Sequence, residues 1–195
     1  MIVLETLVSF LKNEIFSDIE LLEECVEYTR DKLNEYPQIK VYNKVCRQRR
    51  CVGFFSNESI GYRYSGQLAK SKPLNECLIK LLDTVNEKYN TDYNGILVNL
   101  YKTGEDYISA HSDDESNLDN SGVVAISYCA TRKFRIRDKT TRKIVSDIPL
   151  TSGSIIQMGG EFQREFLHEV PIERRVKQER ISFTFRKHTR WHRMI

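Results

Sequence analysis

Apolar side chains recur at helical spacing in two segments of the first half of the chain. The first segment follows Ser17-Asp-Ile-Glu20, which has the pattern of a capping box formed by Ser17 and Glu20, and predicts a helix over about 18–34. The second follows Pro73, a residue tolerated in a first turn, and predicts a helix over about 73–89. The repeating positions are Ile19, Leu22, Val26 and Leu33 in the first segment, and Leu74, Leu78, Leu81 and Val85 in the second.

The pattern changes after residue 95, where short segments rich in β-branched and aromatic residues alternate with turns. The expected strands are Ile96–Tyr101, Val123–Ala130, Lys133–Arg137, Lys143–Ile148, Gly153–Met158 and Arg180–Lys187. Residues 37–72 are basic, aromatic and dotted with glycine, which indicates hairpins or long loops. Strands at this density predict an α+β fold with a sandwich or jelly-roll core and the two helices packed outside it.

Four parts can be distinguished along the 195 residues. We expect an acidic helical N-terminal segment (1–40), a part rich in hairpins with a supporting helix (41–95), a core with the candidate chemistry (96–188) and a basic tail (189–195). Residues 1–36 carry nine acidic and three basic side chains, so the remainder is basic although the whole chain has a net charge of only +3. A basic body makes a polyanionic partner plausible.

The five cysteines have no C-x-x-C spacing, which disfavours a zinc ribbon or a disulfide framework and favours reduced thiols. The N-terminus lacks a basic region before its apolar residues, and no run of about 20 apolar residues occurs. We therefore expect an intracellular, monomeric protein of the nucleus or cytoplasm that does not contact a membrane.

His111-Ser-Asp113 offers an imidazole and a carboxylate that share one face of an extended segment. His168 lies after several strands and could supply a third ligand, giving the two-histidine, one-carboxylate set of non-heme Fe(II) oxygenases. Taken alone, the triplet also fits surface residues, and His168 also fits a structural histidine.

The last strand carries polar side chains on one face and apolar side chains on the other. Its polar face is formed by Arg180, Ser182, Thr184 and Arg186. Buried guanidinium groups need an anion, and a dicarboxylate would neutralise both, whereas solvated arginines on an edge strand are the alternative. Asn99 and Tyr101 share one face of an earlier strand and could bond the same ligand.

Together these residues resemble the AlkB family of 2-oxoglutarate- and Fe(II)-dependent dioxygenases. The resemblance covers about residues 46–187 and is closest to the members that demethylate nucleic acids. The residues that carry it are Asn99-Leu-Tyr101, Gly104, Ile108, His111-Ser-Asp113-Asp114-Glu115, His168 and Arg180-Ile-Ser-Phe-Thr-Phe-Arg186.

The resemblance implies a double-stranded β-helix (jelly roll) that holds Fe(II) through His111, Asp113 and His168. It assigns 2-oxoglutarate to two pairs of side chains, with dioxygen as the other cosubstrate. Arg180 with Tyr101 would bind the distal carboxylate, and Arg186 with Asn99 the end that chelates iron. Family members often have Asn where this chain has Ser182, so one polar contact near the cosubstrate is shortened or lost.

Gly61-Tyr-Arg-Tyr-Ser-Gly66 is similar to the segment of the family that covers a flipped base. The resemblance thus implies that residues 41–95 form a nucleotide-recognition lid with its supporting helix, and that 96–188 form the dioxygenase core. Tyr62 and Tyr64 would lie against the base, and Glu115 would meet its exocyclic amino group. The alternatives are a pair of core or rim tyrosines and a solvated acid.

Other segments allow two interpretations each. Val52-Gly-Phe-Phe55 is either an apolar wedge that fills the gap left by an extruded base or a buried strand. His188 and His192 form a weak rival metal site at helical spacing. Three basic clusters are either phosphate contacts or solvated faces: Lys44 to Arg50, Arg132 to Arg137, and Arg174 to Lys177.

The sequence thus predicts an Fe(II)/2-oxoglutarate-dependent oxidoreductase that demethylates N1-methyladenine and N3-methylcytosine in DNA or RNA. Two alternatives remain open at this point. The same core could hydroxylate a protein or a small molecule, or the fold could bind nucleic acid without turnover.

Overall fold

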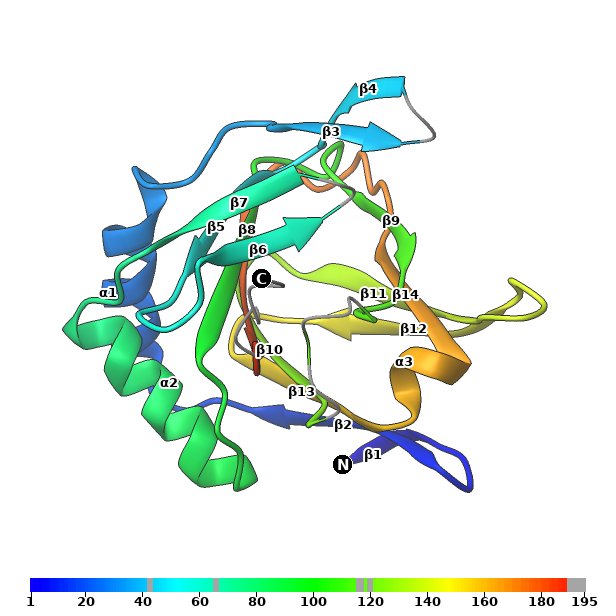
Figure 1. Ribbon diagram of the computed structural model, residues 1–195. Helices are drawn as coiled ribbons and strands as arrows, with labels where there is room; N and C mark the ends of the chain where they lie inside the picture. The colour runs from blue at the N-terminus through cyan, green and yellow to red at the C-terminus, as the bar shows by residue number, and fades with distance from the viewer. Residues whose placement is uncertain (42–43, 65–66, 115–117, 119–120, 189–195) are drawn as a thin grey trace, which may run out of the picture.

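Two β-sheets face each other and two helices cover the outer face of the larger sheet (Figure 1). The computed structural model describes residues 1–41, 44–64, 67–114, 118 and 121–188. The larger sheet has the strand order β1-β2-β13-β10-β15-β8-β5-β7-β6, and the smaller has the order β12-β11-β14-β9. This is the expected jelly-roll core with flanking helices.

The larger sheet draws strands from the whole length of the chain. Its members are β1 (Ile2–Glu5), β2 (Ser9–Ile15), β5 (Cys51–Phe55), β6 (Gly61–Tyr64), β7 (Gln67–Lys72), β8 (Gly95–Tyr101), β10 (Val123–Cys129), β13 (Ser154–Gly160) and β15 (Arg180–Arg186). The smaller sheet contains β9 (Ile108–His111), β11 (Arg132–Asp138), β12 (Ile144–Leu150) and β14 (Phe166–Val170). A separate hairpin joins β3 (Gln38–Val41) to β4 (Lys44–Arg47).

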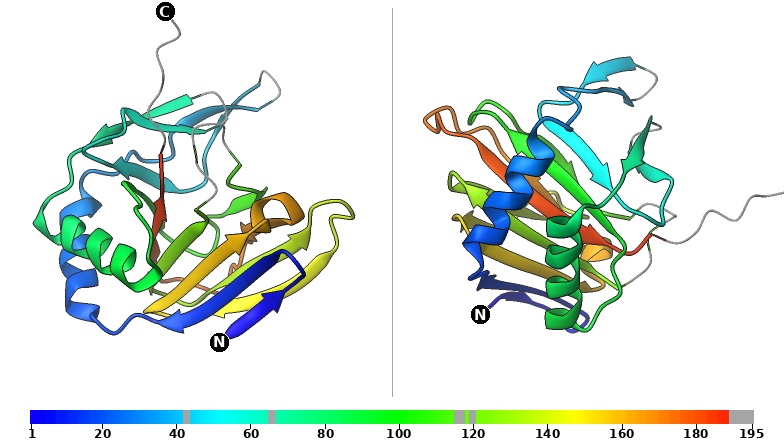
Figure 2. Two further views of the ribbon diagram at one scale, coloured as in Figure 1. Left: turned by 60° about the horizontal axis from the view of Figure 1, so that its bottom comes forward. Right: turned by 90° about the vertical axis from the view of Figure 1, so that its left-hand side faces the viewer.

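The helices α1 (Ile19–Arg30) and α2 (Glu76–Tyr89) pack side by side against the larger sheet, and a short α3 (Phe162–Glu165) precedes β14 (Figure 2). Leu22, Leu78 and Leu81 are fully buried in the core that the helices share with β8, β10 and β15. A second core, which includes Phe134, Ile136 and Met158, fills the space between the sheets.

The helix boundaries differ from the sequence prediction at both N-termini. The α1 N-cap is Asp18, whose carboxylate accepts the Leu21 N–H at 3.0 Å, so the capping box of Ser17 and Glu20 is wrong. Asn75 caps α2 in the same way, which leaves Pro73 outside the helix. In both helices a side-chain oxygen, of Asp18 or of Asn75, accepts a free backbone N–H of the first turn, and this fixes where the helix begins.

Two further predictions are corrected at strand level. Residues 2–5 and 9–15, which we expected in a helical segment, form β1 and β2, and β2 pairs with β13 over its full length. Cys51–Phe55 is a fully buried strand paired with β8, which excludes the wedge interpretation. No helix among the described residues has the length and apolar character needed to cross a membrane.

Candidate active site

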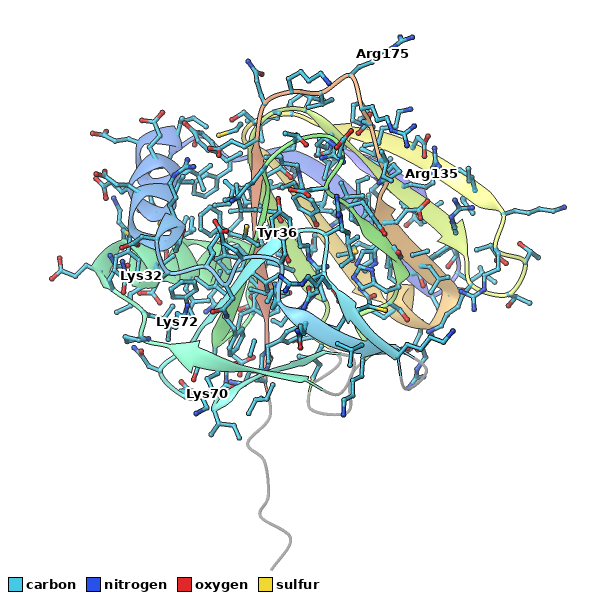
Figure 3. All side chains as sticks on the ribbon, turned by 90° about the horizontal axis from the view of Figure 1, so that it is seen from above. Lys32, Tyr36, Lys70, Lys72, Arg135 and Arg175 are labelled. Atoms are coloured by element: carbon cyan, nitrogen blue, oxygen red, sulfur yellow. The ribbon has the colours of Figure 1, made fainter. Side chains whose placement is uncertain are left out.

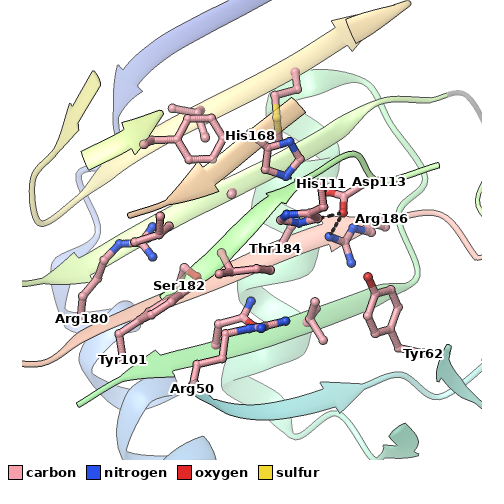
Figure 4. Close-up of a pocket in the computed structure, with 18 residues that line it drawn as sticks. Arg50, Tyr62, Tyr101, His111, Asp113, His168, Arg180, Ser182, Thr184 and Arg186 are labelled. Atoms are coloured by element: carbon pink, nitrogen blue, oxygen red, sulfur yellow. Dashed lines mark hydrogen bonds and ion pairs between the residues drawn. The ribbon is translucent and has the colours of Figure 1, made fainter. Parts of the chain in front are cut away.

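One cavity between the two sheets gathers the polar residues that the sequence analysis singled out (Figure 4). Strand β8 supplies Asn99 and Tyr101, and β15 supplies its whole polar face. The smaller sheet supplies the His111 end of β9 and His168 of β14 from the opposite side. Because strand side chains alternate between faces, the i, i+2 spacing directs each polar set inward.

His111, Asp113 and His168 bring their ligand atoms within 4.8 Å of one another, the only such cluster of three metal-binding side chains within the described part of the chain. His111 and His168 are directly paired across β9 and β14. Their Nε2 atoms lie 3.8 and 3.7 Å from the two Asp113 oxygens. His111 Nδ1 lies 2.8 Å from the Ser109 carbonyl, which assigns the proton to Nδ1 and leaves Nε2 with a lone pair toward the cluster.

The protonation states of the three residues suit a divalent cation. Burial lowers the pKa of His168 to about 3 and lowers that of His111 as well, so both imidazoles are neutral at pH 7. Burial alone would raise the pKa of Asp113, but the charge and the hydrogen bond of the Arg186 guanidinium oppose it, and the pKa lies well below its usual range. Two neutral imidazoles and one carboxylate are a donor set that fits Fe(II).

Arg186 lies at the metal end of the cavity. Its Nη2 is 2.6 Å from Asp113 Oδ1, and its guanidinium lies over the ring of Tyr62 at 4.9 Å. Arg180 lies at the opposite end, with its guanidinium 5.3 Å from the centre of the Tyr101 ring. Arg180 Nη2 donates to Ser127 Oγ at 2.8 Å, whereas Nε and Nη1 are buried without a hydrogen-bond partner.

Unsatisfied donors on a buried cation are costly, so this end of the cavity is built for an anion. Burial lowers the pKa of Arg180, and the neighbouring Tyr101 opposes that change. The structure thus offers one cation beside the metal cluster and a second at the far end of the same cavity, on the two ends of one strand. A dicarboxylate has a matching pair of charges.

Arg50, which lines the cavity, and Ser127, which contacts Arg180, were not predicted as site residues. Arg50 is buried, and its Nε donates to Asn99 Oδ1 at 2.8 Å, so it belongs to the cavity rather than to a phosphate-binding surface. Ser127 holds Arg180, as described above. Arg50 stands in a run of basic residues that resembles a solvated face, and only the pairing of β5 with β8 brings it beside Asn99.

The base-pocket residues are described only in part. Tyr62 is buried against Phe54 and His188 and also lines the cavity, so it is a core tyrosine at the rim of the site. The backbone of Tyr64 belongs to β6, but its side chain lies outside the described part. Glu115 lies outside the described residues altogether.

The interpretation of Arg132 as a phosphate contact is wrong. Its guanidinium is buried and bonds Glu173 and the carbonyls of Thr103, Asp106 and Pro171. Arg135 and Arg137 pair with Asp147 and Glu169 of their own sheet. The Arg175 side chain, in contrast, projects outward from the loop between β14 and β15 (Figure 3).

The rival metal site at the C-terminal end gains no support, because His188 packs against Phe54 with ring centres 4.7 Å apart. His192, its proposed partner, lies outside the described residues.

Comparison with known proteins agrees with this geometry. Residues 3–186 match the model of the 2OG-Fe(II) oxygenase superfamily. The human DNA oxidative demethylase ALKBH2 is 30% identical over 183 residues, which are 90% of this chain and 68% of that protein. The mouse ALKBH2 protein is 31% identical over 188 residues, which are 92% of this chain and 77% of the relative.

The bovine alpha-ketoglutarate-dependent dioxygenase alkB homolog 3 is 33% identical over 135 residues, which are 64% of this chain and 47% of that protein. The solved structure of OsALKBH1 superposes with a TM-score of 0.64 at 15% identity, covering 96% of this chain and all of the matched chain. The chain belongs to the AlkB family within the 2OG-Fe(II) oxygenase superfamily, and is an oxidoreductase that uses Fe(II) and 2-oxoglutarate.

Proposed function

We propose that this enzyme oxidatively demethylates alkylated bases in DNA or RNA, with N1-methyladenine and N3-methylcytosine as its substrates. The observation that carries the proposal is the cavity that holds a two-histidine, one-carboxylate cluster beside the buried Arg186 at one end and the buried Arg180 at the other. The demethylases named among the relatives support the choice of a nucleic-acid substrate. We propose that it acts as an intracellular monomer, in the nucleus or cytoplasm.

In this proposal His111, Asp113 and His168 hold Fe(II). When bound there, Fe(II) supplies, with 2-oxoglutarate and dioxygen, the oxidation of the N-methyl carbon, whose hydroxylated form breaks down to formaldehyde and the unmodified base. The protein contributes the ligands, their protonation states and the exclusion of water. Ile108, Phe134 and Met158 form apolar walls of the cavity, which strengthens the electrostatic interactions inside it.

The two arginines divide the binding of 2-oxoglutarate. Arg180 would hold the distal carboxylate with its two unpartnered donors, beside Tyr101. Arg186 and Asn99 would lie toward the end that chelates iron, where Arg186 contacts Asp113 and Arg50 orients the Asn99 amide. Ser182 pairs with Asn99 across β15 and β8, and its short side chain leaves room where a longer amide would reach the cosubstrate.

The base would enter from the side of β6. A second cavity of about 280 Å³ adjoins the first and shares Arg50 and Tyr62 with it. This supports our assignment of residues 41–95 to nucleotide recognition and of 96–188 to the chemistry. Tyr64 and Glu115 are proposed to contact the cationic methylated base, because an aromatic face and an acid both favour a positive charge.

The test of substrate class measures formaldehyde released from methylated single- and double-stranded DNA and RNA. Release from any of these oligonucleotides is the expected result. If succinate forms but none of the four oligonucleotides releases formaldehyde, the result would instead point to hydroxylation of a protein or a small molecule. Oligonucleotide binding without any succinate would point to a module that does not turn over.

The test of the base pocket uses Tyr64→Ala and Glu115→Gln. Stacking of a base on an aromatic side chain is worth about 1–3 kcal/mol, so Tyr64→Ala should lower the efficiency of demethylation roughly 5- to 150-fold. Succinate formed without nucleic acid should hardly change. Glu115→Gln should weaken activity on cationic lesions more than on an uncharged etheno adduct. Tyr62→Ala should lower both reactions, because Tyr62 lies against Arg186.

A further inference from the structure

The backbone that carries two of the three proposed iron ligands is fixed by contacts from outside β9. Asp113 follows the end of β9 and is one of three residues, 112–114, that continue without regular secondary structure. Its backbone N–H donates to Oε1 of Gln163 in α3 at 2.8 Å. The direction of the Asp113 carboxylate therefore depends on a side chain that lies far along the chain.

Lys139 holds both neighbours of Asp113. Its Nζ lies 2.8 Å from Ser112 Oγ and 2.9 Å from Asp114 Oδ2, and it donates at 2.9 Å to the backbone carbonyl of Gln163. Ser112 Oγ in turn donates to Asp114 Oδ2 at 2.9 Å. One ammonium group thus joins the ligand segment to α3 from the turn between β11 and β12.

These contacts also relate the ligand segment to the third ligand. Helix α3 runs directly into β14, which carries His168 two residues from its start. The Lys139 backbone N–H donates to the Glu165 carbonyl at the end of α3 at 2.9 Å. Gln163 and Lys139 consequently connect residues 111–114, which include two of the ligands, to the strand that carries the third.

We propose that Lys139 and Gln163 are positioning residues that set the metal affinity of the His111, Asp113 and His168 cluster. This rests on the iron site of the proposed function. Groups that orient metal ligands typically change metal affinity 10- to 100-fold when they are removed. The side chains of Lys139 and Asp114 are 31% and 57% exposed, so the contribution of this pair to global stability is small and its effect falls on the geometry of the ligands.

The experiment measures binding of Mn²⁺, followed by loss of the free-ion signal in electron paramagnetic resonance, to the full chain without cosubstrate. Gln163→Met keeps the side-chain length and removes the acceptor. Lys139→Met keeps an unbranched side chain, one atom shorter, and removes the donor. Each should raise the dissociation constant for Mn²⁺ about 10-fold. Lys139→Arg, which keeps a donor, should stay within roughly 3-fold of the wild type. Gln163→Glu, which keeps the acceptor, should bind no more weakly than the wild type.

Lys143→Met is the matched control, because Lys143 is exposed in the same turn and its side chain has no contact with the ligand segment among the described interactions. It should leave Mn²⁺ affinity unchanged. Ser112→Ala removes one partner of Lys139 without touching α3, and should weaken affinity in the same direction even if Lys139→Met fails to fold. The Lys139→Met, Gln163→Met double variant should lose less than the sum of the two free-energy changes, because both act on one segment.

The outcomes separate this inference from the iron site itself. Wild-type affinity in the folded Lys139→Met, Gln163→Met and Ser112→Ala variants, together with loss of binding in His111→Ala, would overturn the positioning role and leave the iron site standing. Binding of Mn²⁺ by His111→Ala as tightly as by the wild type would overturn the site, and the positioning role with it.

Discussion

At the scale of single residues, Asp113 is the charge around which the site is arranged. Arg186 lies on one of its oxygens, and the two histidines approach from the smaller sheet. The carboxylate therefore has two tasks, because it is a proposed metal ligand and also the counter-ion of a buried guanidinium. His111 is partly buried and has only the first task.

Removal of His111 or of Asp113 should abolish turnover, but the two changes should affect the free energy of unfolding differently. We expect no succinate from His111→Ala or Asp113→Ala, because the two remaining ligands cannot hold the metal in a facial array. Asp113→Ala should in addition lower the free energy of unfolding by about 3–5 kcal/mol, since it removes the carboxylate that pairs with the buried Arg186 guanidinium. Denaturant unfolding of both metal-free variants checks this, and equal stability of the two would contradict it.

Arg180 should determine the apparent KM for 2-oxoglutarate. Arg180→Lys keeps the charge but loses the planar pair of donors, and a hydrogen bond to a charged group is worth about 1.5–3 kcal/mol. The apparent KM for 2-oxoglutarate should rise about 10-fold or more, with little change in the affinity for oligonucleotide. Steady-state kinetics at varied 2-oxoglutarate would contradict this if the KM stayed at the wild-type value.

The sequence predicted that Arg180 and Arg186 share one face, because this follows from spacing within one strand, whereas their proposed roles rest on the resemblance to a known family. Arg180 to Arg186 alternate with three apolar residues, and this period of two survives in the structure without a break. Arg50 and Ser127 escaped notice because their roles arise from pairing between strands far apart in the chain. Their neighbours in sequence give no sign of Asn99 or Arg180.

At the scale of elements, the residues that follow β15 pack against Tyr62, which lines the cavity. The residue two positions after this strand, His188, is buried beside Phe54 and Tyr62, and its backbone is bonded to both ends of the Asn94 amide. Burial lowers the pKa of His188 to about 4, and the charge of Arg186 acts in the same direction.

This histidine should make the stability of the metal-free protein depend on pH. Between about pH 6.5 and pH 4 the unfolded chain binds a proton at this position and the folded chain does not, so stability falls as pH decreases. The loss attributable to His188 is at most roughly 3 kcal/mol. His188→Phe should reduce the slope between pH 4.5 and 6.5, as measured by denaturant unfolding. An unchanged slope would mean that His188 is protonated in the folded protein.

The N-terminal strands show where element prediction failed. Residues 2–5 and 9–15 mix apolar and charged residues, which suggested neither an uninterrupted core strand nor a membrane segment. Leu11 is fully buried between the sheets, while Leu7 at the hairpin turn is fully exposed. Strand β2 is interior because it pairs with β13 on the side away from β1, and residues 9–15 and 154–160 are far apart in the chain.

At the scale of the whole molecule, the N-terminal hairpin belongs to the same folding unit as the site. Leu11→Ala should lower the free energy of unfolding by about 2–5 kcal/mol, because it opens a cavity in the core between the sheets. We expect one cooperative transition, with far-ultraviolet circular dichroism and tyrosine fluorescence changing together. Two separate transitions would show instead that residues 1–15 unfold independently.

The pairing of His111 with His168 across β9 and β14 has a consequence for biosynthesis. The two strands are separated in chain order by β10, β11, β12 and β13, and the arginines proposed to bind the cosubstrate come later still. A nascent chain on the ribosome therefore lacks the complete ligand set until β14 has emerged, and lacks Arg186 until its last strand has been made. Such long-range closure is slow compared with local folding. Redox-active iron thus finds its full set of protein ligands only when nearly the entire domain is available to enclose it.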